Sequence, residues 1–211
     1  DGSRRSKADL RMEAVGTCDE VNVALGLVRA ASDALPSQHA DGGNRANVAR
    51  INAVVTAALD RIQSELFDLG AELATTPGQV PEGMAVLSDA HADLLLTEMD
   101  GMLEELAPLT SFVLPGGSDL VARVHQARVV TRRLERLAVR LRNEEDEGVR
   151  PTVLVYLNRL SDWCFVLGRW CAHRLGEDEV LWLPLAHRGP EDGIGGMLAR
   201  QREHDSDVEG L

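Results

Sequence analysis

The sequence has few aromatic residues: Phe, Trp and Tyr together make up 3% of its 211 positions, although 44% of the positions are hydrophobic. The residues available for a core are therefore mainly aliphatic, which favours packed helices over a β-sandwich. A chain of this length can bury one sizeable core. We therefore expect a single domain over residues 1–185 and a flexible C-terminal tail over residues 186–211, where Gly and charged residues occur without periodicity.

The sequence lacks the motifs of several common kinds of site. The cysteines, Cys18, Cys164 and Cys171, are odd in number and show no CxxC spacing, so neither a disulfide framework nor a zinc site is indicated. No Gly-x-Ser-x-Gly, Walker A or GxGxxG pattern is present. No Glu is followed by His three positions later, which argues against a di-iron carboxylate bundle.

Basic residues are outnumbered by acidic residues, 22 against 34, which gives a formal net charge of −12. Phosphate contacts dominate the affinity of nucleic-acid binders and need a broad basic surface, so this charge argues against a general nucleic-acid binder. The sequence contains no run of 18 apolar residues and no signal peptide. We therefore expect a soluble, cytoplasmic protein that has no membrane segment.

Hydrophobic periodicity predicts five helices joined mostly by short connections. Thr17 and Glu20 form an S/T-x-x-E capping box, which predicts that the first helix begins at Thr17 after a polar loop, with Asp19 in its first turn. The other helices are expected at residues 48–73, 88–106, 119–143 and 151–176, with a Gly-rich loop at residues 36–47. This pattern predicts an all-α, five-helix up-and-down bundle.

The helix expected at residues 119–143 (DLVARVHQARVVTRRLERLAVRLRN) carries a dense cationic face. Arg128, Arg132 and Arg136 are spaced four apart and line one side, with Glu135 beside them. The opposite side is apolar and suited to a core: Leu120, Ala127, Val130, Leu134, Leu137, Ala138 and Leu141. Like charges four apart each cost a helix about 0.2 to 0.5 kcal/mol, so the ladder indicates either an anionic partner or a surface neutralised by salt bridges.

Three other polar residues on expected helix faces have both a functional and a structural interpretation. Asp19 is placed to complement a helix dipole, and Asn158 to satisfy a neighbouring helix. Asp162 lies four residues after Asn158 and could pair with Arg159 or Arg169. Taken one at a time, these residues do not identify a site.

Taken together with their surroundings, these residues match a known family. Five blocks of sequence carry the resemblance: residues 6–22 (SKADLRMEAVGTCDEVN), 62–75 (IQSELFDLGAELAT), 111–118 (SFVLPGGS), 125–136 (HQARVVTRRLER) and 156–162 (YLNRLSD). In this order they resemble the PduO-type ATP:cob(I)alamin adenosyltransferases, or corrinoid adenosyltransferases. The resemblance covers about residues 6–183.

The resemblance implies a ferritin-like five-helix bundle that assembles into a homotrimer, with each active site between two subunits. It also implies the reaction, in which the Co(I) of reduced cobalamin attacks the 5′ carbon of ATP in the presence of Mg²⁺. The products would be adenosylcobalamin and inorganic triphosphate. A reductase and a B12-dependent enzyme are implied as possible partners.

The resemblance also implies roles for individual residues. Arg128 and Asp19 match an Arg and an Asp that pair across the subunit boundary, and Phe112 matches the aromatic residue that closes the lower face of the corrin. Positions that bind ATP in the family are matched by Lys7, Arg132, Arg133, Glu135, Arg136, Asn158 and Asp162. Phe112, Arg128, Asp19 and Arg132 are the residues expected to act in catalysis.

The chemistry of these residue types agrees with the implied reaction. Co(I) is a strong nucleophile, so the protein needs no general base but must align the 5′ carbon and hold the leaving triphosphate. Guanidinium groups bind phosphate oxygens in bidentate fashion, and positive charge placed where negative charge develops is usually a large catalytic term.

One departure from the family leaves a second function open. The family begins with a glycine-rich T-x-x-G-D-x-G-T-T loop that wraps the ATP phosphates, whereas here only Asp1, Gly2 and Ser3 precede Arg4. Either the chain is truncated or this loop is lost. The alternative function is a non-catalytic protein that binds adenosylcobalamin or a nucleotide and delivers it.

Overall fold

The computed structural model describes residues 6–38, 45–75, 81–145, 148–184 and 187. Five helices account for most of these residues, and the part of the chain described contains no β-strand beyond one isolated bridge between Val113 and Leu181. The helices are α1 (Leu10–Asp33), α2 (Ala46–Ala74), α3 (Asp89–Leu103), α4 (Asp119–Glu144) and α5 (Pro151–Leu175). The prediction of an all-α five-helix bundle is therefore confirmed.

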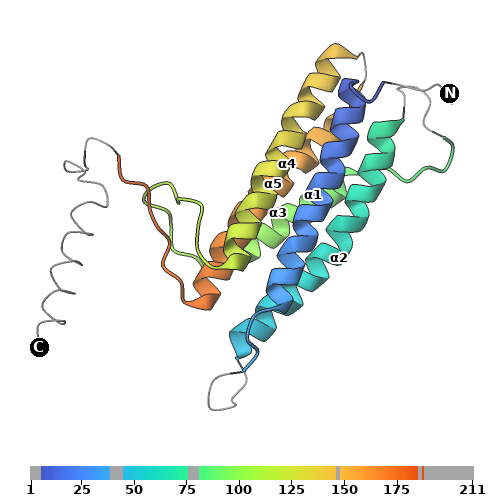
Figure 1. Ribbon diagram of the computed structural model, residues 1–211. Helices are drawn as coiled ribbons and strands as arrows, with labels where there is room; N and C mark the ends of the chain where they lie inside the picture. Colours follow the sequence, from blue (N-terminus) through green and yellow to red (C-terminus); the bar gives the residue numbers. More distant parts are fainter. Residues whose placement is uncertain (1–5, 39–44, 76–80, 146–147, 185–186, 188–211) are drawn as a thin grey trace, which may run out of the picture.

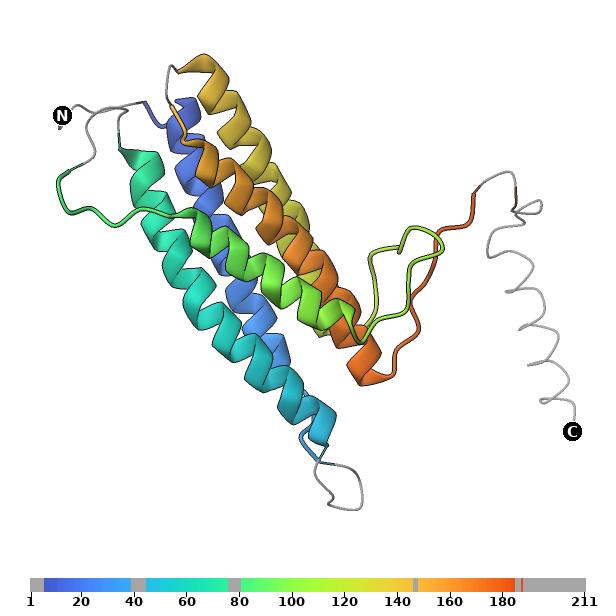
Figure 2. The same cartoon turned by 180° about the vertical axis from the view of Figure 1, so that it is seen from behind.

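The helices run alternately up and down, and four of them form the main bundle (Figures 1 and 2). Helix α1 packs between α2 and α4, and α5 packs against α4 on one side and α2 on the other. Helix α3 lies against α5 on the outside of this group. The core that they enclose is largely aliphatic, as the composition predicts, with Tyr156, Trp163 and Trp170 buried on α5.

The sequence predicts most helix boundaries to within two or three residues. Pro151 begins α5, and Gly176 follows its last residue in the left-handed conformation, with φ of 73°, which glycine adopts without strain. Ser88 precedes α3, where its hydroxyl and the His91 ring form a capping box. On α4 the predicted apolar stripe is buried, except that Val130 is only half-buried.

The predicted start of the first helix is wrong. Helix α1 begins at Leu10, where the Asp9 side chain accepts a hydrogen bond of 2.9 Å from the Arg11 backbone N–H. Thr17 is buried in the middle of α1, because the apolar stripe that faces the core continues upstream of it through Ala14. Asp19 therefore lies nine residues after the first residue of α1, too far to complement the dipole of its N-terminus.

Arg11 is buried, with 1% of its side chain exposed, and joins the ends of three helices. Its guanidinium donates hydrogen bonds to the backbone oxygens of Leu73 (2.7 Å) and Thr75 (2.9 Å) at the end of α2. It also bonds Glu145 (3.2 Å from Nε) and the Gly148 carbonyl (3.2 Å), between α4 and α5. The charge is thus compensated by a carboxylate and three carbonyl groups.

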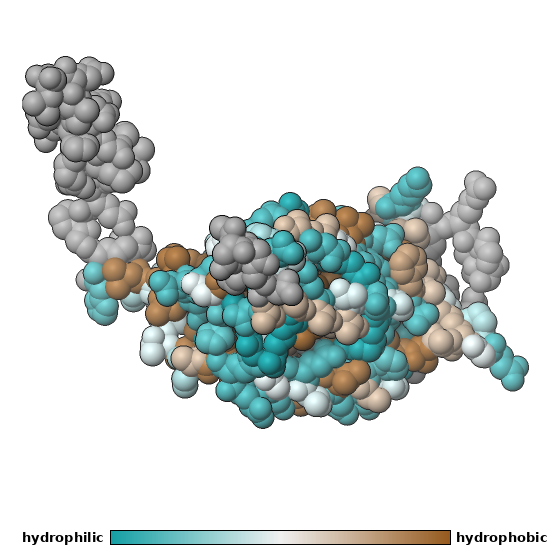
Figure 3. All heavy atoms as spheres, turned by 90° about the horizontal axis from the view of Figure 1, so that it is seen from below, coloured by the Kyte–Doolittle hydropathy of each residue, from teal (hydrophilic) through white to brown (hydrophobic). Residues whose placement is uncertain are grey.

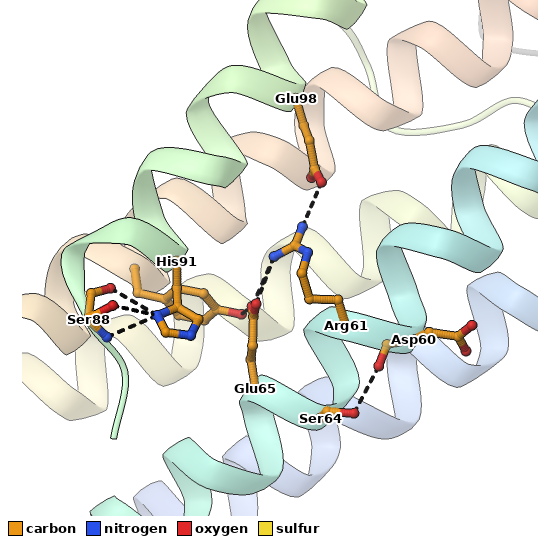
Figure 4. A network of polar contacts seen from close by, with 8 residues as sticks. Asp60, Arg61, Ser64, Glu65, Ser88, His91 and Glu98 are labelled. Carbon is orange, nitrogen blue, oxygen red and sulfur yellow. Dashed lines mark hydrogen bonds and ion pairs between the residues drawn. The ribbon is translucent and has the colours of Figure 1, made fainter. Parts of the chain in front are cut away.

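A second polar network, buried at Tyr156 and Glu65 and partly exposed at Arg61 and Glu98, links α5, α2 and α3 (Figure 4). The Tyr156 hydroxyl donates a 2.6 Å hydrogen bond to Glu65, which also accepts a 2.9 Å bond from Arg61, and Arg61 donates a 2.7 Å bond to Glu98 on α3. Burial and the Glu65 carboxylate raise the pKa of Tyr156, so the phenol remains a donor at neutral pH. These bonds position α3 relative to the main bundle.

Replacing Arg11 with Met should destabilise the protein, because it removes the buried hydrogen bonds that Arg11 donates to Glu145 and to three carbonyl oxygens. We expect the free energy of unfolding to fall by about 3 kcal/mol, as for other broken buried ion pairs. Chemical denaturation measures this change. Arg140→Met is the matched control: Arg140 is exposed and, among the described residues, pairs with Glu144 alone (3.4 Å), so its loss should cost about 0.5 kcal/mol or less. Equal losses in both variants would show that the Arg11 contacts contribute little.

Candidate functional site

The outer face of α4 presents the arginines that the sequence analysis singled out. Arg132, Arg133 and Arg136 are exposed, whereas Arg128 is half-buried, with its Nε atom shielded and without a hydrogen-bond partner. The helical spacing of four residues sets Arg128, Arg132 and Arg136 on one side of α4, as predicted. The buried side of the same helix packs against α1 and α5. The cationic face therefore lies on the outside of the bundle, on the side of α4 that points away from α1 and α5.

Glu135 and Asn158 lie beside these arginines and connect α4 to α5. The Asn158 amide donates a 3.2 Å hydrogen bond to one Glu135 oxygen, and the other oxygen is 3.7 Å from the Arg132 guanidinium. That second oxygen is buried and has no hydrogen bond. Arg132, Glu135 and Asn158 are thus brought together in one subunit. Asn158 on α5 therefore forms a hydrogen bond to the neighbouring helix α4, as its structural interpretation predicts. Its partner, Glu135, is itself a candidate site residue.

The residues of α1 lie on the other side of the cationic face. Arg133 forms an ion pair with Glu20, and Asp19 is exposed. Within the single subunit described, Asp19 and Arg128 do not form an ion pair with each other. The expected pairing of Asp19 with Arg128 is therefore not made within the described part of the chain, and a pairing between subunits stays a prediction.

Lys7 and Asp162 are not brought into contact with the arginines. Lys7 is exposed in the turn before α1, near the end of the bundle where α4 ends, since Arg11 contacts Glu145 there. Asp162 is exposed one turn after Asn158. The structural interpretation of Asp162 is wrong for both suggested partners, because Arg159 pairs with Asp93 (2.6 Å) and Arg169 with Glu179 (2.7 Å).

Two segments, residues 104–118 and 177–184, project together beyond the opposite end of the bundle and are called the arm (Figures 1 and 2). The Leu114 N–H donates to the Val180 carbonyl (2.8 Å), and the Trp182 N–H donates to the Phe112 carbonyl (2.7 Å). The Ser111 hydroxyl donates to the Trp182 carbonyl (2.8 Å). The arm is therefore a short ladder of two antiparallel segments.

Phe112 lies on the arm and is 76% exposed, so it is not part of the core. Its ring packs edge-to-face against Trp182, with centroids 5.8 Å apart and planes at 67°. The exposed apolar residues of the arm also include Leu114, Leu181 and Leu183. Figure 3 shows hydrophobic residues gathered on the arm, at the left of the view, beside a mainly hydrophilic bundle end. An exposed aromatic pair of this kind is suited to cover a flat apolar ligand.

A cavity of about 50 Å³ lies at the base of the arm, between the arm and helices α4 and α5. His125 lines it, is 5% exposed, and has an Nδ1 atom without a hydrogen-bond partner. Burial and the nearby Arg128 charge lower the pKa of His125, so the ring is neutral at pH 7. The sequence analysis proposed no role in the site for His125 or for the buried Arg169. For Arg169 the available signal was a charge inside the apolar run of residues 163–170 (WCFVLGRW).

Other chemistries find little support. Burial raises the pKa of Cys18, Cys164 and Cys171 to about 12, so these thiols remain protonated at neutral pH. Within the described ranges, no group of three or more His, Cys, Asp and Glu side chains is arranged to hold a metal ion. None of the helices described is both long and apolar enough to span a bilayer. What the surface offers is a cationic face and an apolar arm.

Comparison with known proteins identifies relatives over most of the chain. The cobalamin adenosyltransferase family model matches residues 1–171. The corrinoid adenosyltransferase of Mycobacterium tuberculosis strain H37Rv is 38% identical over 185 residues, which cover 87% of this chain and 86% of the relative. The corrinoid adenosyltransferase of Bacillus subtilis is 36% identical over 179 residues, covering 85% of this chain and 83% of the relative.

A similar fold is found among solved structures. A PduO-type ATP:corrinoid adenosyltransferase from Lactobacillus reuteri, solved as a Phe-to-Ala variant with cobalamin and ATP, superposes with a TM-score of 0.72. It is 28% identical in sequence, and the match covers 85% of this chain and 90% of that one. An Arg-to-Lys variant of the Lactobacillus reuteri enzyme, complexed with ATP, also has a TM-score of 0.72.

Proposed function

Because the chain belongs to the cobalamin adenosyltransferase family, we propose that it transfers the 5′-deoxyadenosyl group of ATP to the cobalt of reduced cobalamin. It is a corrinoid adenosyltransferase, and its products are adenosylcobalamin and inorganic triphosphate. In the step itself a cobalt–carbon bond forms with the electron pair of Co(I), and the bond between the 5′ carbon and the triphosphate oxygen breaks. The released charge stays on the triphosphate, so no proton transfer is required.

The observation that carries this proposal is the cationic face of α4 in a chain whose net charge is −12. Arg132, Arg133 and Arg136 remain exposed although acidic residues are abundant elsewhere, which suits the binding of a polyanion. In the proposed site these arginines hold the triphosphate, and Glu135 and Asn158 hold the nucleoside or orient Arg132. Lys7 and Asp162 are proposed as further ATP contacts, and Mg²⁺ is expected to accompany the nucleotide.

Phe112 is proposed to close the lower face of the corrin. Its exposure on the arm supports this role, because a large aromatic ring in water gains free energy when it is covered by an apolar ligand. An apolar wall at Phe112 would keep water and cobalamin's own base away from the lower axial position of the cobalt. Co(II) without that ligand is more easily reduced to Co(I).

We propose that the active site is completed by a second subunit of a homotrimer. Phe112 and Lys7 lie at opposite ends of the bundle, separated by the length of α4, whose 26 residues span about 39 Å. That separation is too large for both residues to contact the reacting atoms in one subunit. Asp19 and Arg128 are the proposed contact between subunits. A reductase that supplies Co(I), a B12-dependent enzyme that receives the product, and a cytoplasmic location also remain proposals.

The direct test of the function is an anaerobic assay with ATP and reduced cobalamin that follows the loss of the Co(I) absorbance. We expect adenosylcobalamin and triphosphate to form in equal amounts. Binding of both substrates without turnover would instead support the alternative, a protein that binds and delivers the cofactor.

Arg132→Ala should raise the Michaelis constant for ATP and lower turnover, because a hydrogen bond from Arg to phosphate is lost. Such charge-assisted bonds contribute about 1.5 to 3 kcal/mol, or about tenfold to a hundredfold in kcat/KM. Steady-state kinetics measure this loss. Arg140→Ala, further along α4, serves as the control and should leave kcat/KM unchanged. Unaltered kinetics in Arg132→Ala would favour a surface role for Arg132.

Reversing the charges of Asp19 and Arg128 tests the subunit contact. Asp19→Arg and Arg128→Asp should each weaken the trimer and reduce turnover, because each places like charges together. The double variant should recover part of both losses if the residues are direct partners. Light scattering reports the oligomeric state beside the activity assay. A monomer with full turnover would contradict a site shared between subunits.

The variant Phe112→Ala should distinguish whether Phe112 packs in the core or closes the lower face of the corrin. Loss of a core Phe would cost about 3 to 5 kcal/mol of stability. Because Phe112 is 76% exposed, we expect little change in unfolding or in ATP binding. Adenosylation that starts from Co(II) should fall much further than adenosylation from preformed Co(I). Electron paramagnetic resonance of bound Co(II)alamin with ATP reports the axial ligand, and a surviving four-coordinate signal would exclude this role for Phe112.

A further inference from the structure

One buried side chain, Arg169 of α5, binds both segments of the arm. Arg169 is 6% exposed. Its Nε donates a 2.7 Å hydrogen bond to one oxygen of Glu179, and its terminal nitrogen donates a 3.1 Å bond to the other. The same nitrogen donates a 3.0 Å bond to the Ala107 carbonyl. Glu179 belongs to the returning segment of the arm and Ala107 to the outgoing one, so a single guanidinium group holds both.

Apolar packing contributes less to the position of the arm than it does elsewhere in the fold. The cavity of about 50 Å³ at the base of the arm is bordered by Val113, Leu114, Glu179 and Val180, so these residues do not pack closely against α4 and α5. Cavities remove the dispersion contacts that would otherwise fix neighbouring groups. Polar ties therefore decide where the arm lies. Trp170 and Arg174 of α5 also bind the outgoing segment, at Glu105. The 3.0 Å bond from the Ser118 backbone N–H to Glu177 joins the two segments of the arm to each other. Among the described side chains of α5, Arg169 is the one that holds both segments.

The geometry of these contacts requires arginine. The planar guanidinium group binds both carboxylate oxygens at once and has a further N–H available for the carbonyl, whereas a lysine ammonium is a point charge without this fork. Burying such a group is unfavourable unless it is paired, so a buried Arg among apolar neighbours needs its partners in place. Arg169, Glu179 and Ala107 thus define one orientation of the arm relative to α5.

We infer that Arg169 is a positioning residue of the adenosyl transfer, which acts by holding the arm so that Phe112 meets the lower face of the corrin at a fixed place. This inference rests on the proposed function, and in particular on the role of Phe112. Arg169 lies beneath the arm and contacts no substrate in this scheme. Its loss lets the arm move without removing the Phe112 ring, so the exclusion of the lower ligand becomes incomplete.

Arg169→Met tests the inference, because Met keeps the length of the side chain and removes its charge and donors. We expect adenosylation starting from Co(II) to fall about tenfold, the change typical of losing a hydrogen bond to a charged group. Adenosylation from preformed Co(I) and the Michaelis constant for ATP should change by less than about twofold, since the α4 arginines are untouched. The four-coordinate Co(II) signal seen in the presence of ATP should decrease in proportion to the loss of adenosylation from Co(II).

The chain offers a control with the same kinds of hydrogen-bond partner in Arg150, which is more exposed than Arg169 and lies at the other end of α5. Arg150 binds both oxygens of Glu72 (2.7 and 2.9 Å) and the Leu87 carbonyl (2.8 Å), the same set of partners as Arg169. Arg150→Met should therefore lower the thermal stability and leave the ratio of the Co(II) and Co(I) rates unchanged. If Arg169→Met does not fold, Glu179→Gln weakens the same tie from the partly exposed side and should shift the ratio in the same direction.

Hydrogen exchange without substrates tests the tie independently of the reaction. Amides of residues 107–118 and 177–184 should exchange faster in Arg169→Met than in the parent protein, and remain unchanged in Arg150→Met. If the arm amides exchange faster in Arg169→Met but the parent protein has no adenosyltransferase activity, the role of Arg169 in holding the arm would stand and the proposed function would be overturned. Folded Arg169→Met and Glu179→Gln variants that keep the parent ratio of Co(II) and Co(I) rates would overturn the inference and leave the proposed function standing.

Discussion

Helix α4 has to bury one face between α1 and α5 while it keeps a row of guanidinium groups available on the other. The buried face supplies the free energy that holds the helix in the bundle, and the exposed face supplies the positive charge of the proposed site. The positions of α1 and α5 follow from this division of α4 into a buried and an exposed face. Helices α1 and α5 are the neighbours that cover the apolar stripe, and they also bring Glu20 and Asn158 to the edges of the cationic face.

The sequence predicts this arrangement well where periodicity decides the structure. The apolar stripe of α4, the proline that begins α5 and the glycine that follows it are local features, and their outcomes agree with the structure. The start of α1 was predicted wrongly because the pattern of Thr17 and Glu20 also fits the middle of a helix. Only the continuation of the buried stripe through Ala14 distinguishes the two cases, and that depends on what the helix packs against.

Buried charges are the part of the molecule that the sequence could not place. Arg11 lies in a local sequence that allows either a surface or a buried position. The apolar run around Arg169 indicates burial but not the partner. The partners of Arg11 and Arg169 lie 134 and 10 residues away in the chain. Glu65 and Tyr156 are 91 residues apart. Such pairs form because folding brings together residues of different segments, so no spacing rule within one helix predicts them. The resemblance to a family suggested candidate site residues but gave no information about these supports.

The placement of the three tryptophans gives the molecule a selective optical probe. Trp163 and Trp170 are buried in α5, with 1% and 2% exposed, whereas Trp182 is 40% exposed and touches Phe112 on the arm. Buried indoles emit at shorter wavelengths and are shielded from quenchers in solution, so the long-wavelength, quenchable emission of the unlabelled protein comes from the arm. Occupation of the surface beside Phe112 by a corrin, which absorbs visible light, would extinguish this emission first and so distinguish events at the arm from those on the cationic face.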